Sequence, residues 1–259
     1  MDLGIAGRWA IVCASSQGLG RACALALAGE GVNVVVNGRN ETRLTDAAAE
    51  IRALHPVEVR AVAADIATAA GRESLLAACP SPDILVTNNA GPKPGAFTEI
   101  DDADLAVALD LHYFAPLGLV RGVLDGMRER RFGRIVNITS AMVTTPHPAM
   151  AASAGARAGL TAVMKGLSRL SVADNVTINQ LLPERIDSGR QQQLAYREAE
   201  REGVSVDEAR RRQAMSIAAG RLGRPEELAA ACAFLCSALA GYISGVNLHL
   251  DGGSYLGLV

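Results

Sequence analysis

Residues 9–20 read WAIVCASSQGLG, an apolar run that leads into a turn with two glycines and then into a helix. Gly18 and Gly20 leave the backbone N–H groups at the start of that helix open to close approach, and Ser15 and Ser16 offer hydroxyl groups. A diphosphate binds to such a turn, because the N–H groups and the helix dipole favour negative charge. Short glycine turns before helices are common, so the interpretation depends on the strand–turn–helix context.

Short apolar runs alternate with longer amphipathic segments along the whole chain. The runs are rich in Val and Ile without polar alternation, which is typical of strands covered on both faces. We therefore predict a single doubly wound, Rossmann-type α/β domain over residues 1–259, with a seven-stranded parallel sheet and helices on both faces. Strands are expected at Trp9–Ala14, Val32–Asn37, Val57–Ala63, Ile84–Asn88, Arg134–Thr139, Val176–Leu182 and Val246–Leu250. Helices are expected at Gly20–Gly29, Thr42–Leu54, Gly71–Ala78, Asp101–Arg131, Met150–Asp174 and Pro225–Ala238.

Composition excludes several classes of function. The formal net charge of −2 gives no electrostatic reason to expect nucleic acid or an anionic membrane as a partner. Residues 228–250 lack Asp, Glu, Lys and Arg, but Gly241 and Gly245 break this stretch, so we expect no membrane span. No leader pattern opens the chain, and we expect a cytoplasmic location. The five cysteines have neither zinc-site nor CxxC spacing, which predicts no metal site and reduced, mostly buried thiols.

The end of the second predicted strand bears on the choice of nucleotide. An NAD-specific site places an acid there to hold the ribose 2′-hydroxyl. This chain instead has Asn37-Gly38-Arg39-Asn40, in which Arg39 can hold a 2′-phosphate through two hydrogen bonds. The sequence therefore favours NADP over NAD; the alternative is an ordinary surface arginine on a turn.

Three further motifs accompany the glycine turn. Asn88-Asn89-Ala90-Gly91 ends the fourth predicted strand, Asn137-Ile138-Thr139-Ser140 ends the fifth, and Asp251-Gly252-Gly253 follows the last. Together they resemble the short-chain dehydrogenase/reductase family over nearly the whole chain, and most of all its members similar to 3-oxoacyl-carrier-protein reductases. The chain departs from the family turn at Ala14, which replaces a glycine. Alanine favours negative φ, so the change either narrows the turn or is harmless, and we expect it to be harmless.

The resemblance implies more cofactor contacts than the residues alone predict. Asp65 is expected to contact the adenine amino group, Ser188 the nicotinamide carboxamide or the diphosphate, and Arg157 the ribose hydroxyls. The expected cofactor-binding residues are Ala14, Ser15, Ser16, Gly18, Leu19, Gly20, Arg39, Asp65, Asn89, Ala90, Gly91, Arg157 and Ser188.

The reacting centre of the resembling family contains a Ser, a Tyr, a Lys and an Asn. Ser140 matches the Ser, whereas Ser153, Arg157 and His112 stand where Tyr, Lys and Asn are expected. A cation can move a phenol's pKa toward neutrality, but an aliphatic hydroxyl is far less acidic and shorter. Loss of a positioned general acid typically costs about 10²–10⁴-fold in rate. Arg157 keeps a fixed positive charge at its position.

Another group could replace the missing Tyr. His147 lies in the loop TTPHP, residues 144–148, and imidazole titrates near neutral pH, so it could exchange a proton with an alcohol. The alternative is that His147 only covers the pocket rim. His112 is expected to pack inside the long helix. Glu184, where the family has Gly, is expected to face solvent or to pair with Arg185 or Arg190, or else to act as an acid of its own.

Residues 189–213 are densely charged, which predicts a solvated helical surface. In the resembling family this region is a mobile lid, here expected at about 184–219, and members usually form homodimers or homotetramers through the two long helices. The leading hypothesis is an NADP(H)-dependent oxidoreductase acting on a small-molecule carbonyl/alcohol pair. The alternative is a nucleotide-binding protein without hydride transfer. A lyase-type reaction comes last, because relatives that dehalogenate keep the Tyr and lose the glycine turn.

Overall fold

The computed structural model describes residues 1–92 and 94–258, so Lys93 and Val259 lie outside the described part. Its centre is a seven-stranded sheet in the order β3-β2-β1-β4-β5-β6-β7, parallel at every pairing. The strands are β1 (Trp9–Val12), β2 (Asn33–Gly38), β3 (Val59–Ala63), β4 (Ile84–Thr87), β5 (Gly133–Ile138), β6 (Val176–Pro183) and β7 (Asn247–Leu250). The predicted fold class is confirmed, and each expected strand overlaps an observed one.

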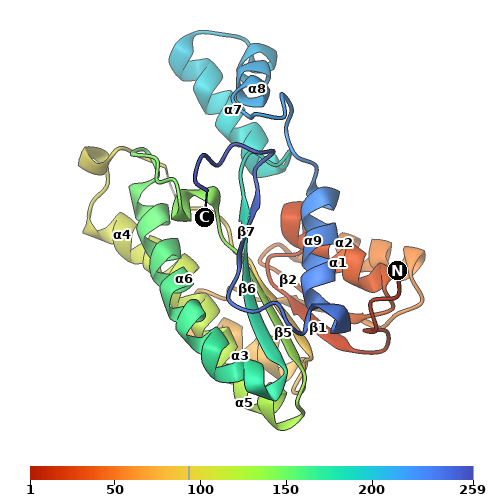
Figure 1. Ribbon diagram of the computed structural model, residues 1–259. Helices are drawn as coiled ribbons and strands as arrows, with labels where there is room; N and C mark the ends of the chain where they lie inside the picture. Colours follow the sequence, from red (N-terminus) through yellow and green to blue (C-terminus); the bar gives the residue numbers. More distant parts are fainter. Residues whose placement is uncertain (93, 259) are drawn as a thin grey trace.

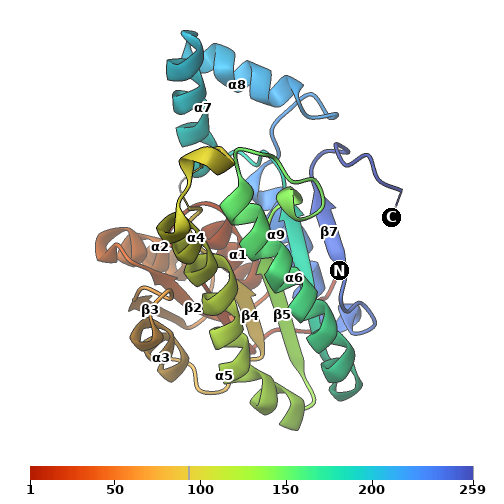
Figure 2. The ribbon, with the colours of Figure 1, turned by 90° about the vertical axis from the view of Figure 1, so that its left-hand side faces the viewer.

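Helices cover both faces of the sheet, as Figures 1 and 2 show. One face carries α1 (Gly18–Gly29), α2 (Glu41–Leu54) and α9 (Pro225–Cys236), and the other carries α3 (Ala69–Ala77), α5 (Ala115–Glu129) and α6 (Ala151–Ser171). Leu27, Val34 and Leu228 belong to the buried cluster on the first face. Leu119 and Ile135 belong to the cluster on the second. Because both faces are buried, the strands need apolar side chains in both directions.

The strand order changes direction between β1 and β4. From β1 the chain proceeds to β2 and β3 on one side, and from β4 it proceeds to β5, β6 and β7 on the other. Val12 of β1 pairs with Val86 of β4, so the two carboxyl ends lie side by side. Ligands of open α/β sheets bind outside the carboxyl ends of the strands at this point.

The helix expected over Asp101–Arg131 is interrupted. The structure has α4 (Asp102–Leu109), a π-helical turn η2 (Asp110–Phe114) and then α5. Pro116 explains the change, because it has no N–H to donate to the carbonyl of His112 and its ring would clash there in an α-helix. The N–H of Ala115 instead donates to the Asp110 carbonyl, which widens the turn. Such widened turns occur often at functional sites.

The charged segment forms two helices, α7 (Gly189–Glu202) and α8 (Val206–Met215), which project beyond the carboxyl ends of the strands (Figure 1). The two helices pack on each other through Ala195, Ala199 and Ala209. A buried amide pair adds to this contact, because Gln191 Nε2 donates to Gln213 Oε1 at 2.7 Å. The expectation of a solvated helical surface is met on the outer side, where several arginines pair with acids.

Two expectations about the core can be compared directly with the structure. All five cysteines are free and buried, and burial raises the pKa of Cys13 to about 12. Residues 228–250 divide into α9, the 3₁₀ turn η5 (Ala238–Ala240) and β7. The helical stretch Asp102–Glu129 is long and apolar enough to cross a membrane by length and composition alone. Its α5 part packs against β4, β5 and β6, and a core helix meets the same criteria.

Candidate active site

The glycine turn after β1 has the shape that close approach to a helix N-terminus requires. Gly18 has φ +58°, and a Cβ added there would meet no atom within 4 Å. A Cβ at Gly20 would lie 2.4 Å from the Ala14 carbonyl oxygen, so only glycine fits. Leu19 between them is partly buried and packs on the core under α1. The residues present therefore fit an anionic dinucleotide.

Ala14 adopts φ +46°, the left-handed region that favours glycine. The turn therefore holds this alanine in a conformation that a glycine would adopt more easily. For a residue with a Cβ this conformation costs about 1–2 kcal/mol. A hydrogen bond from the Ala14 N–H to Asn37 Oδ1, at 3.3 Å, contributes to holding it.

The two serines of the turn have different environments. Ser15 is fully buried, and its hydroxyl donates to the Val12 carbonyl at 2.7 Å and accepts from the Asn37 N–H at 2.9 Å. It therefore joins β1 to β2 and is not available to a phosphate, contrary to expectation. Ser16 is half-buried and remains as the candidate hydroxyl donor.

Two arginines, Arg39 and Arg43, follow β2 near the glycine turn. Arg39 is exposed, and its Nη1 lies 3.8 Å from Asp65 Oδ2, too far for a strong ion pair. Arg43, which sequence reasoning missed, donates from Nη1 to Gln17 Oε1 of the turn at 3.3 Å. The sequence signal for Arg43 was its position four residues after Arg39, in the first turn of α2. Asn37 is committed to structure, because its Nδ2 donates to the carbonyls of Val62 and Ala64.

The segment after β4 joins the sheet to the π-helical turn. Asn89 Nδ2 donates to the Leu111 carbonyl at 3.2 Å, and its Oδ1 accepts from the Ala90 N–H. Gly91 follows at the same edge of the sheet. Ser188, after β6, caps α7 by accepting from the Gln191 N–H at 3.4 Å, which leaves its hydroxyl hydrogen free to donate.

Ser140 follows β5 and is half-buried. Its Oγ accepts from the Met142 N–H at 3.2 Å and so caps the short 3₁₀ turn η3 (Ala141–Val143). The capping bond uses a lone pair and leaves the hydroxyl hydrogen free to donate to a substrate oxygen.

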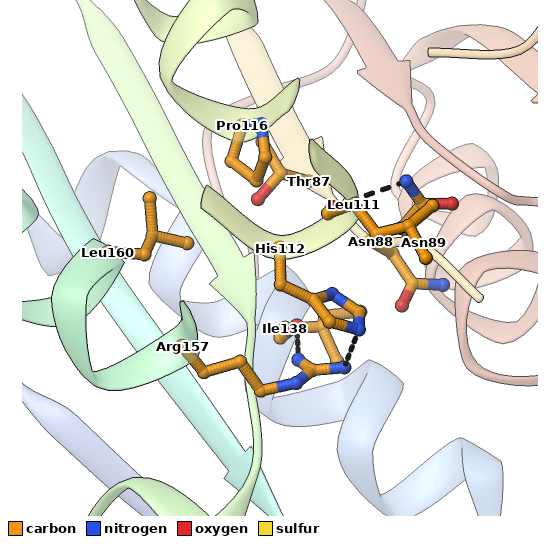
Figure 3. A pocket seen from close by; sticks show the side chains of 9 residues that line it. All are labelled: Thr87, Asn88, Asn89, Leu111, His112, Pro116, Ile138, Arg157 and Leu160. Carbon is orange, nitrogen blue, oxygen red and sulfur yellow. Dashed lines mark hydrogen bonds between the residues drawn. The ribbon is translucent and has the colours of Figure 1, made fainter. Parts of the chain in front are cut away.

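Arg157 is anchored on the end of β5, as Figure 3 shows. Its Nη1 donates to the carbonyls of Ile138 and Thr139 at 3.0 and 2.7 Å, and its Nε donates to Ser153 Oγ at 3.2 Å. Nη2 lies 3.3 Å from His112 Nε2. Four of the five N–H groups of a guanidinium therefore have partners, and one remains. No carboxylate lies within 4.0 Å of this group in residues 1–92 and 94–258. Burial, with Arg190 as a smaller cause, lowers the pKa of Arg157 to about 10, so it stays a cation at neutral pH.

His112 lies on the π-helical turn and is 3% exposed. Burial, followed by the charges of Arg157 and Arg190, lowers its pKa to about 2. The ring is therefore neutral, its Nε2 accepts from Arg157, and its proton resides on Nδ1. A cavity of about 10 Å³ with a mixed polar and apolar lining adjoins the pair and is bounded also by Thr87 and Asn88 (Figure 3). That volume is close to the minimum that holds one water molecule.

Ser153 is 5% exposed, and its hydroxyl faces the guanidinium of Arg157. Ser153 and Arg157, two of the residues expected to be catalytic, are therefore hydrogen-bonded to each other. His147 is exposed, and its Nδ1 accepts from the Ala149 N–H at 3.2 Å. In the neutral ring the proton therefore resides on Nε2, where it could be donated outward.

A second histidine near this loop was not singled out from the sequence. His249 of β7 has its Nε2 3.4 Å from Thr144 Oγ1, its Nδ1 3.5 Å from Asp251 Oδ2, and its ring stacked on Tyr255. The available signal was a histidine inside an apolar strand next to an acid two residues on. The Nδ1 of His249 is buried and makes no hydrogen bond within the described residues, so Asp251 lies near the ring without a hydrogen bond that would orient it.

The shifted pKa of His112 predicts a pH dependence of stability. The unfolded chain binds a proton on this residue near pH 6.5, whereas the folded chain does not, so stability present above pH 6.5 is lost as the pH falls toward 2. Between pH 7 and pH 5 the natural chain should lose about 2 kcal/mol more than a His112→Asn variant. Guanidinium denaturation at both pH values measures this, and an equal loss in the two proteins would contradict the buried neutral imidazole.

The positive φ of Ala14 makes a second prediction. Ala14→Gly removes the left-handed penalty but adds the entropy of glycine in the unfolded chain, so we expect a net gain of about 0.5–1 kcal/mol. Ala10→Gly, in the middle of β1, is the control and should destabilise. Denaturation curves of the three proteins provide the comparison, and a loss of stability in Ala14→Gly would refute the strained turn.

Comparisons with known proteins agree with this geometry over the full length of the chain. The family model described as enoyl-(acyl carrier protein) reductase matches residues 13–255. The NADPH-dependent reductase BacG of Bacillus subtilis is 31% identical, over 95% of this chain and 97% of its own. The 3-oxoacyl-[acyl-carrier-protein] reductase FabG of Rickettsia felis is 28% identical, over 96% and 97%.

Among solved structures, L-sorbose reductase from Gluconobacter frateurii, crystallised with NADPH and L-sorbose, superposes with a TM-score of 0.94 and 31% identity, covering 100% of both chains. With the parallel sheet, the glycine turn and the segments after β4 and β5 all in place, the protein belongs to the short-chain dehydrogenase/reductase family, in the group described as enoyl-(acyl carrier protein) reductase.

Proposed function

We propose that the protein is an NADP(H)-dependent oxidoreductase acting on a carbonyl/alcohol pair, similar to the 3-oxoacyl-carrier-protein reductases. The observation that supports this most is the glycine turn with Arg39 and Arg43 beside it, which fits a dinucleotide carrying an extra phosphate. Relatives described as NADPH-dependent or crystallised with NADPH support the same cofactor. NADPH supplies a hydride when bound. Substrate binding, orientation and proton transfer depend on the residues of the chain.

Ser140 is the proposed group that polarises the substrate carbonyl, because its hydroxyl hydrogen is free. Arg157 and Ser153 hold the end of β5 and the start of α6 around it, and one N–H of Arg157 remains for a ribose hydroxyl. The proton comes from an imidazole, with His147 as the first candidate and His249 as the second, or from water.

A binding protein without hydride transfer is the second candidate. It is favoured by one observation, namely that Ser153 is buried and hydrogen-bonded to Arg157 in place of a phenol beside Ser140. Such a protein would use the same nucleotide site as a sensor or as a structural subunit.

The surroundings of the site complete the proposal. Residues 184–219 act as a lid over the substrate, which is supported by the position of α7 and α8 beyond the carboxyl ends of the strands (Figure 2). The chain acts in the cytoplasm as a homodimer or homotetramer, paired through α5 and α6. Exposed apolar side chains on α4 and η2, which precede α5, support a partner there; they are Val107, Leu109 and Phe114. Sedimentation at micromolar concentration would test the assembly.

Arg39 should determine the preference for NADPH. An Arg39→Met variant loses charge-assisted hydrogen bonds to the 2′-phosphate, each worth about 1.5–3 kcal/mol, so the Kd of NADPH should rise about 10–100-fold. The Kd of NADH should change less than about threefold. Fluorescence titration measures both, with exposed Arg121→Met as the control. Equal losses for the two nucleotides would remove Arg39 from the proposal.

The activity itself is tested by NADPH oxidation with a panel of ketones and 3-oxoacyl thioesters. We expect turnover, and a combined Ser153→Tyr, Arg157→Lys, His112→Asn variant should raise the rate at least tenfold by restoring a positioned acid. His147→Ala and His249→Ala separate the two histidines, because only the proton donor's loss should lower the rate. Tight NADPH binding with no ketone reduced above background would favour the binding protein.

A further inference from the structure

The arginines of α7 and α8 fall into two groups. Four of them lie within 4.0 Å of a carboxylate; they are Arg201, Arg210, Arg211 and Arg212. Arg190 and Arg197, two helical turns apart on α7, have no carboxylate at that distance within the described ranges. Arg190 is half-buried. Acids are abundant in this segment, so the absence of one beside Arg190 marks a position that stays electropositive.

Arg190 reaches across to the segment that follows β4. Its Nη2 donates to the Pro92 carbonyl at 3.0 Å, and its guanidinium covers Gly91, where an added Cβ would lie 3.2 Å from Nη2. The described residues supply one neutral acceptor for a group with five N–H donors. A half-buried guanidinium has lost part of its hydration, and an anion would offset that cost.

Further positive charge lies on the same side of the site. Arg190 covers Gly91, two residues after Asn89, and Asn89 is hydrogen-bonded to the carbonyl of Leu111, the neighbour of His112. In agreement with this, Arg190 contributes to the lowered pKa of Arg157 and of His112, of which burial is the main cause. Within residues 1–92 and 94–258, Arg157 also has no carboxylate within 4.0 Å, and His112 is neutral. Arg157 and Arg190 therefore bring positive charge to the edge formed by β4, β5 and α6.

This region lies apart from the phosphate sites after β1 and β2, although it includes Gly91 and adjoins Ser188, which are expected to contact other parts of the cofactor. The diphosphate turn follows β1, and Arg39 and Arg43 follow β2. Arg190 instead contacts residues after β4 and influences groups on η2 and α6, which flank the segment that ends in Ser140. A negative charge held by Arg190 would consequently belong to the molecule that Ser140 contacts.

We propose that Arg190 binds an anionic group, a carboxylate or a phosphate, on the carbonyl or alcohol substrate, so that the protein selects acidic substrates over neutral ones. The inference rests on the proposed function, because it assumes that a carbonyl compound binds at Ser140. Arg190 is then a specificity-determining residue delivered by the lid. A bidentate guanidinium contact gives both strength and orientation to such an anion.

The experiment measures binding to the NADP⁺-loaded protein by calorimetry, so that it does not depend on turnover. The probes are pyruvate, acetoacetate and levulinate, each paired with its methyl ester, because the distance from carbonyl to anion is varied in this series. At least one acid should bind the natural protein tenfold or more tightly than its ester. Arg190→Gln should bring that ratio to within about twofold, and Arg190→Lys should recover part of it.

Two controls separate the possible outcomes. Arg201→Gln, on the same helix but paired with Glu202, should keep the acid-to-ester ratio of the natural protein. The Kd of NADPH should change less than threefold in Arg190→Gln. Equal binding of every acid and its ester by the natural protein would overturn the proposal, as would a weakened NADPH Kd with an unchanged ratio, which assigns Arg190 to the cofactor. Selective acid binding without any ketone reduction would count against the proposed activity alone.

Discussion

When helices cover both faces of a parallel sheet, polar residues from separate strands come together at the edge where the strands end. That constraint governs the rest of the molecule. The turn after β1, the arginines after β2, the Asn89 segment after β4, Ser140 after β5 and the helices α7 and α8 after β6 are far apart in the chain, and each stands at this edge because its strand ends there. The apolar strands supply the burial that stabilises the sheet, and the loops supply the chemistry.

The sequence predicted the strands and the glycine turn well, since unbroken Val- and Ile-rich runs that end in turn residues are typical of buried parallel strands. It failed mainly where the outcome depended on contacts between distant segments, and once where a local signal was overlooked. Ser15 looked like a phosphate ligand, yet its hydroxyl joins β1 to β2. The π-helical turn followed from Pro116, a local signal that the long apolar pattern concealed. Neither the isolation of Arg190 nor the place of His249 near Thr144 could be read from spacing, because each depends on how separate elements pack.

The centre of the site illustrates the same limit. An arginine at position 157 predicted a fixed positive charge, which the structure retains, but most of its donors face inward to the end of β5 and to His112. The guanidinium of Arg157 is buried and hydrogen-bonded to carbonyl oxygens and to a neutral ring, so it stabilises the structure in addition to being a candidate ligand of the cofactor. The bond depends equally on His112, because its Nε2 accepts from Arg157 only while the ring is neutral. The identities of these residues were visible in the sequence, but their mutual dependence was not.

The hydrogen bonds among His112, Ser153 and Arg157 limit which single substitutions the site accepts. A lysine at 157 has three N–H donors in place of five, so it could not satisfy Ile138, Thr139, Ser153 and His112 together. A bulky ring at 153 would have to enter space that the guanidinium now shares with a small hydroxyl. Exchanging any one of residues 112, 153 and 157 alone would leave a buried acceptor or a buried charge without its partner, which costs stability. The three side chains therefore form one unit, in which a change at one position calls for matching changes at the other two.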